Sequence, residues 1–547
     1  MTSAPPSAGG ANWRRPVFWL TALLIGGLFV ALRARWIGHL LFWDEAMHLL
    51  TTRALYGGGT DGYSPWFWRH PPLLGVLSLL LEPLRAGYAE RAEWLTLALG
   101  TAGLIPLFLL NRRAFGPGVA LASLGFLAVM PGAVFYGTWI KEEPVVILGG
   151  LTALLCFDRR RYWLAGLALG AAFLGKELAI FYALAVAALW WLRSPHERHW
   201  RDLAATAAAT ALTAGWWFVC FSVTLRHFWH LTTGSVQGES TDWARPWSFY
   251  LAKLPGDLGW AGLALLVAGA VLAGVLLLGR GRQRQAPPSA DTGVRPPGAP
   301  LSAWPLALLL PGFAVITVVR LKAPWFIVTL YPAIATLQGL VLVSLLRALY
   351  RWLPERPRLA GLLGAGATAA VILIFLPPRL ADSYEALAER QEHNLLTGSQ
   401  TSAVAARVMN TLVQDDDRVL LTPMHYWRLT EVVPCPIFTY YFRPVAVVVR
   451  PFDLTYADFV DTVRKYQIHW AMLSPPPDPG VRELLNPIVQ RLGLRPVFNA
   501  GVCVFHTTLL WQPQEARKGG PEAAGIRARN VSDGSRIAVP QGKLNPD

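Results

Sequence analysis

Long apolar runs separated by short, arginine-rich loops constrain the fold of this sequence more than any other feature. A helix needs roughly 20 apolar residues to cross the hydrocarbon core of a bilayer. Only 15% of the residues are charged, whereas about one-quarter are charged in an ordinary soluble domain. We therefore predict an all-α polytopic membrane protein with about 11 transmembrane helices. The predicted spans lie at 16–38, 94–111, 118–139, 144–157, 162–175, 178–192, 203–224, 257–279, 302–319, 325–346 and 359–377.

The distribution of Arg and Lys among the loops indicates how the chain is oriented. Arg14 and Arg15 precede the first run, and every second loop after it is basic. These loops lie at 111–113, 159–161, 193–201, 280–295 and 347–358. Because cytoplasmic loops carry an excess of basic residues, we expect a multi-pass protein of the cytoplasmic (inner) membrane with a cytoplasmic N-terminus. Orientation then explains the net charge of +15, and no nucleic-acid partner is expected.

This orientation holds only if the apolar run at 71–84 does not cross the membrane. The run opens with Pro71-Pro72 and is interrupted by Glu82 and Pro83, which favours an interfacial or re-entrant helix. The outer segments are then 39–93, 140–143, 175–177, 225–256, 320–324 and the whole chain after 378.

The sequence changes character near residue 385, where short apolar runs alternate with amphipathic stretches. The runs lie at 418–422, 445–449 and 469–473, and one amphipathic stretch lies at 457–466. This pattern is typical of a small soluble α/β domain. We predict a transmembrane domain at 1–380 with its first outer loop at 39–93, an outer α/β domain at 381–512 and a disordered tail at 513–547. Cys435 and Cys503 share the outer domain, where a disulfide is permitted.

The first outer loop holds the first candidate catalytic residues, Asp44 and Glu45. Adjacent carboxylates cannot share one helix face, so at most one of them points into a given site. A carboxylate in a partly desolvated place has a raised proton affinity, which suits a general base. The alternative is the acidic start of an interfacial helix.

Later in the same loop, an aromatic stretch ends in Arg69 and His70, which could hold a phosphate. The alternative there is membrane anchoring by a snorkelling Arg and interfacial aromatic rings.

Glu142 and Glu143 lie at the mouth of a short span. A carboxylate there that faces Asp44 could position an acceptor or, with Glu143 as ligand, help to bind a divalent cation. The alternative is a solvated turn, and the sequence leaves any metal unknown.

Two further cations are predicted at the outer side. The runs at 144–157 and 162–175 span only about 21 Å each at 1.5 Å per residue, so Lys176 and Glu177 should lie below the outer surface. Ionisable residues at that depth are functional candidates, although Lys176 and Glu177 could simply neutralise each other. Lys322, at another outer mouth, could attract a lipid phosphate or anchor the span end.

The sequence lacks the motifs of several functional classes. The sequence contains no Walker loop, no HExxH and no cysteine-based metal pattern, which argues against ATP-driven transport and zinc proteolysis. A secondary transporter would carry polar residues near the middle of many spans, whereas most spans here are free of them.

At the candidate residues the sequence resembles the GT-C superfamily of membrane glycosyltransferases, which includes protein mannosyltransferases of family 39 and bacterial aminoarabinose transferases to lipid A. Asp44-Glu45 is similar to the family's acidic pair, and His70-Pro71-Pro72-Leu73 is similar to its Lys/His-Pro-Pro-Leu element. The stretch from Gly166 to Glu177 resembles a glycine-rich helix that closes in Thr-Lys-Gly, with Glu177 in place of the last glycine. With His48 and Lys322-Ala323-Pro324-Trp325, these motifs most resemble a prokaryotic branch labelled flippase-associated.

The resemblance implies transfer of a sugar from a polyprenyl-phosphate donor to a glycan, lipid or protein acceptor on the outer face, and direct displacement would invert the anomeric centre. Matching positions would make Asp44 the catalytic base, with Glu45 beside it, and Glu142 or Glu143 the second acid, where several relatives carry Asp. Lys176 and Lys322 would hold the donor phosphate. The alternative function is a non-catalytic accessory protein in the assembly or flipping of a lipid-linked glycan.

Overall fold

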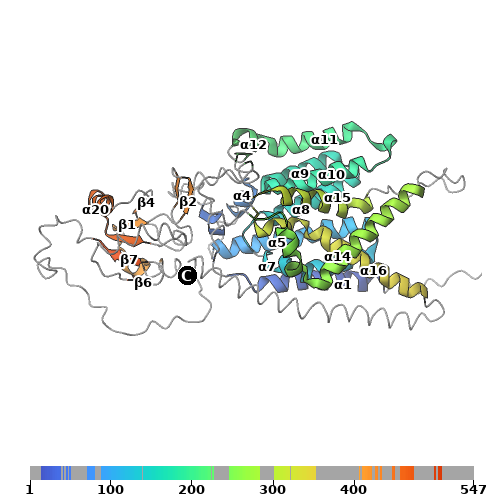
Figure 1. Ribbon diagram of the computed structural model, residues 1–547, viewed down its shortest axis with the longest axis horizontal. Coiled ribbons are helices and arrows are strands. Elements are labelled where there is room, and N and C mark those ends of the chain that lie inside the picture. Colours follow the sequence, from blue (N-terminus) through green and yellow to red (C-terminus); the bar gives the residue numbers. More distant parts are fainter. Residues whose placement is uncertain are drawn as a thin grey trace, which may run out of the picture. The chain divides into compact units, whose positions relative to one another are not determined.

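The computed structural model contains two compact units (Figure 1). Unit 1 comprises Met1–His39, Pro65–Ser235 and Ser240–Arg390, and unit 2 comprises Leu40–Ser64, Val236–Glu239 and Gln391–Asp547. The described residues are 14–38, 41, 45–46, 48–50, 71–79, 88–137, 139–222, 225–226, 229, 245–283, 301–320, 322–352, 406, 409–414, 416–421, 425–428, 431–433, 446–449, 456–473, 498–499 and 503–507.

The described part of unit 1 is helical. Its α-helices are α1 (Arg14–Ala34), α4 (Leu73–Leu79), α5 (Tyr88–Ala114), α6 (Pro117–Val129), α7 (Pro131–Phe135), α8 (Glu143–Asp158), α9 (Tyr162–Gly175), α10 (Ile180–Trp191), α11 (Trp200–Thr210), α12 (Trp216–Cys220), α14 (Phe249–Gln283), α15 (Trp304–Val318) and α16 (Tyr331–Trp352). Five described stretches are long and apolar enough to cross a membrane: Glu90–Ala114, Trp200–Cys220, Phe249–Leu278, Leu301–Val318 and Pro324–Arg351. The chain is therefore a mostly helical, multi-pass membrane protein.

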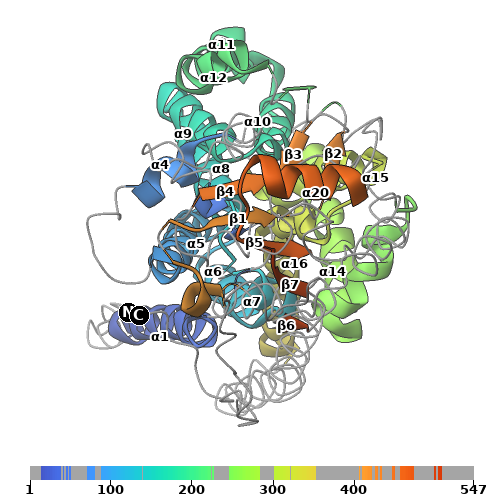
Figure 2. The ribbon, with the colours of Figure 1, turned by 90° about the vertical axis from the view of Figure 1, so that its left-hand side faces the viewer.

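Helices α8 to α11 lie together and carry the two short spans predicted from the sequence (Figures 1 and 2). α8 has 16 residues and α9 has 14, about 24 Å and 21 Å at 1.5 Å per residue. α9 packs closely on α11, because a Cβ atom on Gly166 would lie 2.3 Å from the carbonyl oxygen of Thr206. Only glycine permits this approach of two backbones.

Three predicted spans are interrupted. The span expected at 118–139 breaks into α6 and α7 at Met130, which is extended (φ −68°, ψ 121°) because it precedes Pro131. α14 is kinked at Gly259, where φ is +68° and ψ is 158°. A π-helical turn at Ala211–Gly215 joins α11 to α12. The span expected at 359–377 lies outside the described residues, as does the part of the 71–84 run that follows α4.

Unit 2 contains a five-stranded mixed sheet of order β4-β1-β5-β7-β6 (Figure 2). Its strands are β1 (Arg418–Leu421), β4 (Ala446–Val449), β5 (Trp470–Leu473), β6 (Phe498–Asn499) and β7 (Cys503–His506), and β2 (His425–Arg428) pairs with β3 (Glu431–Val433) in a separate ribbon. β4, β1 and β5 are parallel, whereas β7 is antiparallel to its neighbours. Helix α20 (Tyr456–Lys465) buries Phe459 and Val463, one helical turn apart. The three apolar runs predicted from the sequence coincide with β1, β4 and β5.

Candidate active site

Three segments of unit 1 that are far apart in the sequence meet at one end of the helices. They are the turn before α8, the turn after α9 and the 3-10 helix Pro324–Leu330 that leads into α16. Pro144 favours the start of α8, because proline fits the first turn of a helix, and Gly175 ends α9. Five ionisable side chains in these turns and just before the 3-10 helix are buried, and we call them the acid–lysine cluster: Lys141, Glu142, Glu143, Lys176 and Lys322.

Lys176 bridges the two acids of the cluster. Its Nζ atom lies 2.7 Å from Oε1 of Glu143 and 3.3 Å from Oε2 of Glu142. All three residues are at most 5% exposed. A buried charge is tolerated only when it is paired and hydrogen-bonded, so these contacts explain how the chain holds three charges here. The two ion pairs of Lys176 join residues 33 and 34 positions apart in the sequence, rather than Lys176 and the adjacent Glu177.

Lys141 connects the same turn to the segment before α16. Its Nζ atom lies 3.3 Å from the centroid of the Trp325 ring and 5.4 Å from that of Trp139. The two indole rings are 6.0 Å apart. An ammonium over an aromatic face contributes about 0.5–2 kcal/mol, so these contacts fix one segment against the other. Lys141 and Trp325 are both evident in the sequence, but their contact is seen only in the structure.

Lys322 differs from Lys176 in how its charge is compensated. It is 3% exposed, and its Nζ atom donates a hydrogen bond to the carbonyl oxygen of Val319. Among the described residues, no carboxylate forms an ion pair with it. A backbone carbonyl satisfies a donor but leaves the charge uncompensated, so this position is suited to an anion.

A second buried polar group supports the segment that carries Lys322. Tyr250 donates a hydrogen bond of 2.9 Å to the carbonyl oxygen of Ala323. About two turns further along α14, Asp257 accepts hydrogen bonds from Lys253 (2.7 Å) and Tyr331 (2.8 Å). The sequence interpretation missed this group. The signal was a Lys and an Asp four residues apart at the edge of an apolar run, a spacing that pairs them on a helix.

The remaining predicted site residues belong to other parts of the chain. Asp44, Arg69 and His70 lie outside the described residues. Glu45 is described in unit 2, where its side chain is buried. Cys435 also lies outside the described residues, so the predicted disulfide stays a prediction.

A divalent cation does not fit the described donors on their own. The described residues contain no group of three or more His, Cys, Asp or Glu that could hold a metal ion. At Glu143, one carboxylate oxygen already accepts from the ammonium of Lys176 at 2.7 Å. A metal cation there would compete with the positive charge of Lys176 for the same carboxylate.

The chain is similar in sequence to bacterial aminoarabinose transferases, although no family model matches it. It is 28% identical over 364 residues to the undecaprenyl phosphate-α-4-amino-4-deoxy-L-arabinose arabinosyl transferase of Pseudomonas paraeruginosa, a match that covers 60% of each chain. The corresponding protein of Pseudomonas aeruginosa is 28% identical over 335 residues, 56% of each chain. The match thus spans about 60% of the length of these curated relatives.

Solved structures extend the similarity to the fold. Apo ArnT from Cupriavidus metallidurans has a TM-score of 0.59 at 16% identity, and ArnT bound to undecaprenyl phosphate has 0.55 at 15%. Both matches cover 92% of this chain and 100% of ArnT. The Archaeoglobus fulgidus oligosaccharyltransferase has a TM-score of 0.50 at 12% identity, covering 84% of this chain and 69% of its own. The predicted resemblance to aminoarabinose transferases is thus confirmed, and the chain has the membrane fold of ArnT.

Proposed function

We propose that the protein is a membrane glycosyltransferase that moves a sugar from a polyprenyl-phosphate donor to an acceptor on the outer face of the cytoplasmic membrane. The observation that carries this proposal is the acid–lysine cluster, which gathers buried charges at one end of an ArnT-like helical fold. A similar structure was solved with undecaprenyl phosphate bound, and the curated relatives are named undecaprenyl phosphate-α-4-amino-4-deoxy-L-arabinose arabinosyl transferases.

The donor phosphate meets Lys322 first in this proposal. Among the described residues, buried Lys322 donates to a backbone carbonyl and to no carboxylate, whereas the charge of Lys176 is shared with Glu142 and Glu143. Lys176 contributes the rest of the positive field, and Arg69 and His70 of the first outer loop add further donors. A cation beside the phosphate stabilises the anion as the sugar leaves.

Asp44 is the proposed base. It takes the proton of the acceptor while the acceptor oxygen or nitrogen attacks the anomeric carbon, and the carbon–oxygen bond to the phosphate breaks on the opposite side. This single displacement inverts the anomeric centre. Glu45 is the neighbouring acid, and Glu142 or Glu143 orients the acceptor through a hydrogen bond.

The topology and domain division belong to the same proposal. We place the N-terminus in the cytoplasm, 11 spans within residues 1–380, an outer α/β domain at 381–512 and a tail at 513–547. The positions of the basic loops support this orientation, and the acceptor is a glycan, a lipid or a protein.

Sugar transfer in proteoliposomes tests the proposal. The wild type is given a synthetic polyprenyl-phosphate sugar, and donor affinity is measured separately. Asp44→Asn keeps the size of the side chain and removes its basicity, so transfer should fall about 10²–10⁴-fold while donor binding is retained. Asp61→Asn makes the same change in the same loop and serves as the control.

The accessory-protein alternative predicts a different pattern. In that case the wild type transfers sugar from no plausible donor, and Asp44→Asn still supports glycan assembly in cells. That result would reject the enzymatic proposal.

A further inference from the structure

Helices α9 and α11 line an open recess of about 420 Å³ at the end of α9 that is remote from the acid–lysine cluster. Its lining includes Arg160, Arg161, Tyr162, Trp163, Arg201 and Asp202. Tyr162 is the first residue of α9 and Lys176 follows the last, so the recess and the cluster are about 21 Å apart along the helix axis.

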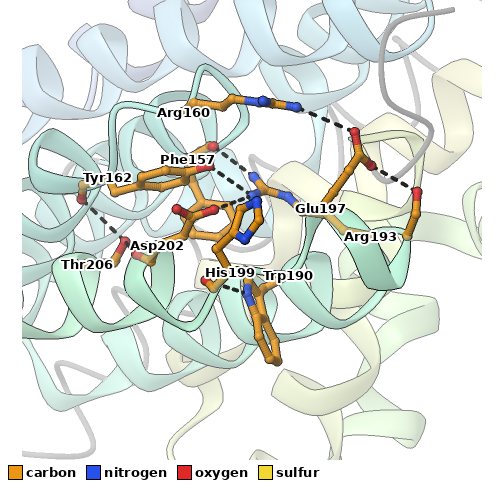
Figure 3. A network of polar contacts seen from close by, with 10 residues as sticks. Phe157, Arg160, Tyr162, Trp190, Arg193, Glu197, His199, Asp202 and Thr206 are labelled. Atoms are coloured by element: carbon orange, nitrogen blue, oxygen red, sulfur yellow. Dashed lines mark hydrogen bonds and ion pairs between the residues drawn. The ribbon is translucent and has the colours of Figure 1, made fainter. Parts of the chain in front are cut away.

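A network of hydrogen bonds fixes the wall of this recess (Figure 3). Nη1 of Arg193 donates to the hydroxyl oxygen of Tyr162 at 3.1 Å and to Oδ2 of Asp202 at 3.3 Å, and Nη2 donates to the carbonyl oxygen of Phe157 at 3.1 Å. Thr206 of α11 donates to the carbonyl oxygen of Tyr162 at 3.3 Å. The ends of α8, α9, α10 and α11 are thereby joined, and the one acid in the lining, Asp202, is neutralised by Arg193.

The arginines of the lining differ in their partners. Arg160 lies 3.4 Å from Glu197 in an exposed ion pair. Partial burial would raise the pKa of Glu197, but the hydroxyl of Ser194 and the charge of Arg160 hold that pKa below its usual range. Arg161 and Arg201 are exposed, and no described carboxylate forms an ion pair with either. Two uncompensated guanidinium groups, one from each wall, therefore face one recess, and guanidinium forks match phosphate oxygens.

The surface beside the recess is apolar. Trp163, Leu164 and Leu167 of α9 are all about half exposed. On a membrane helix such a face lies against acyl chains. We propose that the recess binds the phosphate headgroup of an anionic phospholipid through Arg161 and Arg201, with an acyl chain along Leu164 and Leu167. In the topology proposed above, this lipid belongs to the cytoplasmic leaflet, where basic pockets between membrane helices hold anionic headgroups.

Lipid retention by the purified full-length protein tests this site. Native mass spectrometry measures the binding of added phosphatidylglycerol and of phosphatidylcholine with matched acyl chains. We expect the wild type to prefer phosphatidylglycerol and Arg161→Gln/Arg201→Gln to bind it about thirtyfold more weakly. Arg161→Lys/Arg201→Lys, which keeps the charge, should retain most of the binding.

The matched control is Arg159→Gln/Arg351→Gln, which removes two exposed arginines outside the recess and should bind phosphatidylglycerol like the wild type. An equal loss in this control would show general attraction to basic loops and overturn the site. Displacement of the lipid by glycerol 3-phosphate at a similar concentration would show a soluble anion as the occupant and overturn the lipid assignment. Sugar transfer is not part of the readout, so the test is independent of the proposed activity.

Discussion

Lys176 and Lys322 are both buried lysines at the same end of unit 1, yet their surroundings give them different chemistry. Lys176 is held by Glu142 and Glu143, whereas Lys322 donates to a backbone carbonyl. A compensated cation is mainly structural in the resting protein, and an uncompensated one is open to an incoming anion. Substitutions at the two positions should therefore fail in different ways.

Replacing Lys322 should weaken binding of the sugar donor more than it lowers the stability of the fold. Lys322→Ala removes a charged donor from the proposed phosphate site, and a hydrogen bond to a charged group contributes about 1.5–3 kcal/mol. Affinity for a polyprenyl-phosphate sugar should fall about 10–100-fold. Lys322→Arg keeps the charge and serves as the control. Equal donor binding by wild type and Lys322→Ala would remove Lys322 from the phosphate site.

Replacing Lys176 should reduce stability first. Lys176→Met leaves Glu142 and Glu143 buried without their shared cation, and removing one partner of a buried pair costs about 3–5 kcal/mol. Thermal unfolding in detergent should therefore begin at a clearly lower temperature. The triple variant Glu142→Gln/Glu143→Gln/Lys176→Met removes all three charges and should recover most of the loss. No recovery would show that packing, rather than charge, sets the stability there.

The sequence identified these residues but not their partners. Lys176 followed from the shortness of the two neighbouring spans, because lipid thickness limits where a charge can lie. Its nearest acid in the sequence, Glu177, was one possible partner, whereas the ion pairs of Lys176 are made with Glu142 and Glu143 at the start of α8 through tertiary packing. Side-chain contacts such as Lys141 on Trp325 depend on the fold as a whole, so no local pattern could predict them.

At the scale of the elements, α14 shows how one glycine shapes a helix. Gly259 has φ +68° and ψ 158°, a region in which essentially only glycine is unstrained. The kink directly follows the turn that carries Lys253 and Asp257, which are joined at 2.7 Å. The kink thus separates the turn that carries Asp257, the acceptor of the hydrogen bond from Tyr331, from the long remainder of α14.

Alanine substitutions at two glycines of α14 should have opposite effects. A Cβ atom would meet no other atom within 4 Å at either Gly256 or Gly259, so the difference is purely conformational. Gly259→Ala should cost about 1–3 kcal/mol, whereas Gly256→Ala, within the helix, should be neutral or stabilise by up to about 1 kcal/mol. Thermal unfolding of the two variants measures this, and equal stability would mean that the kink is not held in solution.

The ends of helices could be predicted where charged residues flank an apolar run, but interruptions within a helix could not. α8 and α9 end within one residue of the predicted spans, because Arg159, Arg160 and Arg161 separate them. The break at Met130 occurs inside a continuous apolar run, and the kink at Gly259 occurs at the start of another, two residues after Asp257. Spans were predicted from hydropathy. Pro131 and Gly259 change the direction of the backbone without changing the hydropathy of the run, so these interruptions could not be predicted.

At the scale of the whole molecule, the proposed orientation can be tested by labelling. Cysteines introduced at Gly59 and Ser248 should react with an impermeant reagent from outside, and a reporter fused at Arg160 should be cytoplasmic, because the basic loops favour that side. Labelling of Gly59 only after permeabilisation would mean that the 71–84 run crosses, and the proposed site residues would then lie on different sides.

The shortness of α9 also makes bilayer thickness a variable for this protein. Its 14 residues cover about 21 Å against a hydrocarbon core of about 30 Å, and its exposed face includes Trp163 and Leu164. α14, with 35 residues, covers far more than the full depth. This hydrophobic mismatch requires the bilayer to thin beside α9, which costs a fraction of a kcal/mol per Å. Membranes of shorter acyl chains should therefore favour the folded protein, and within one membrane it should gather where the bilayer is thinnest.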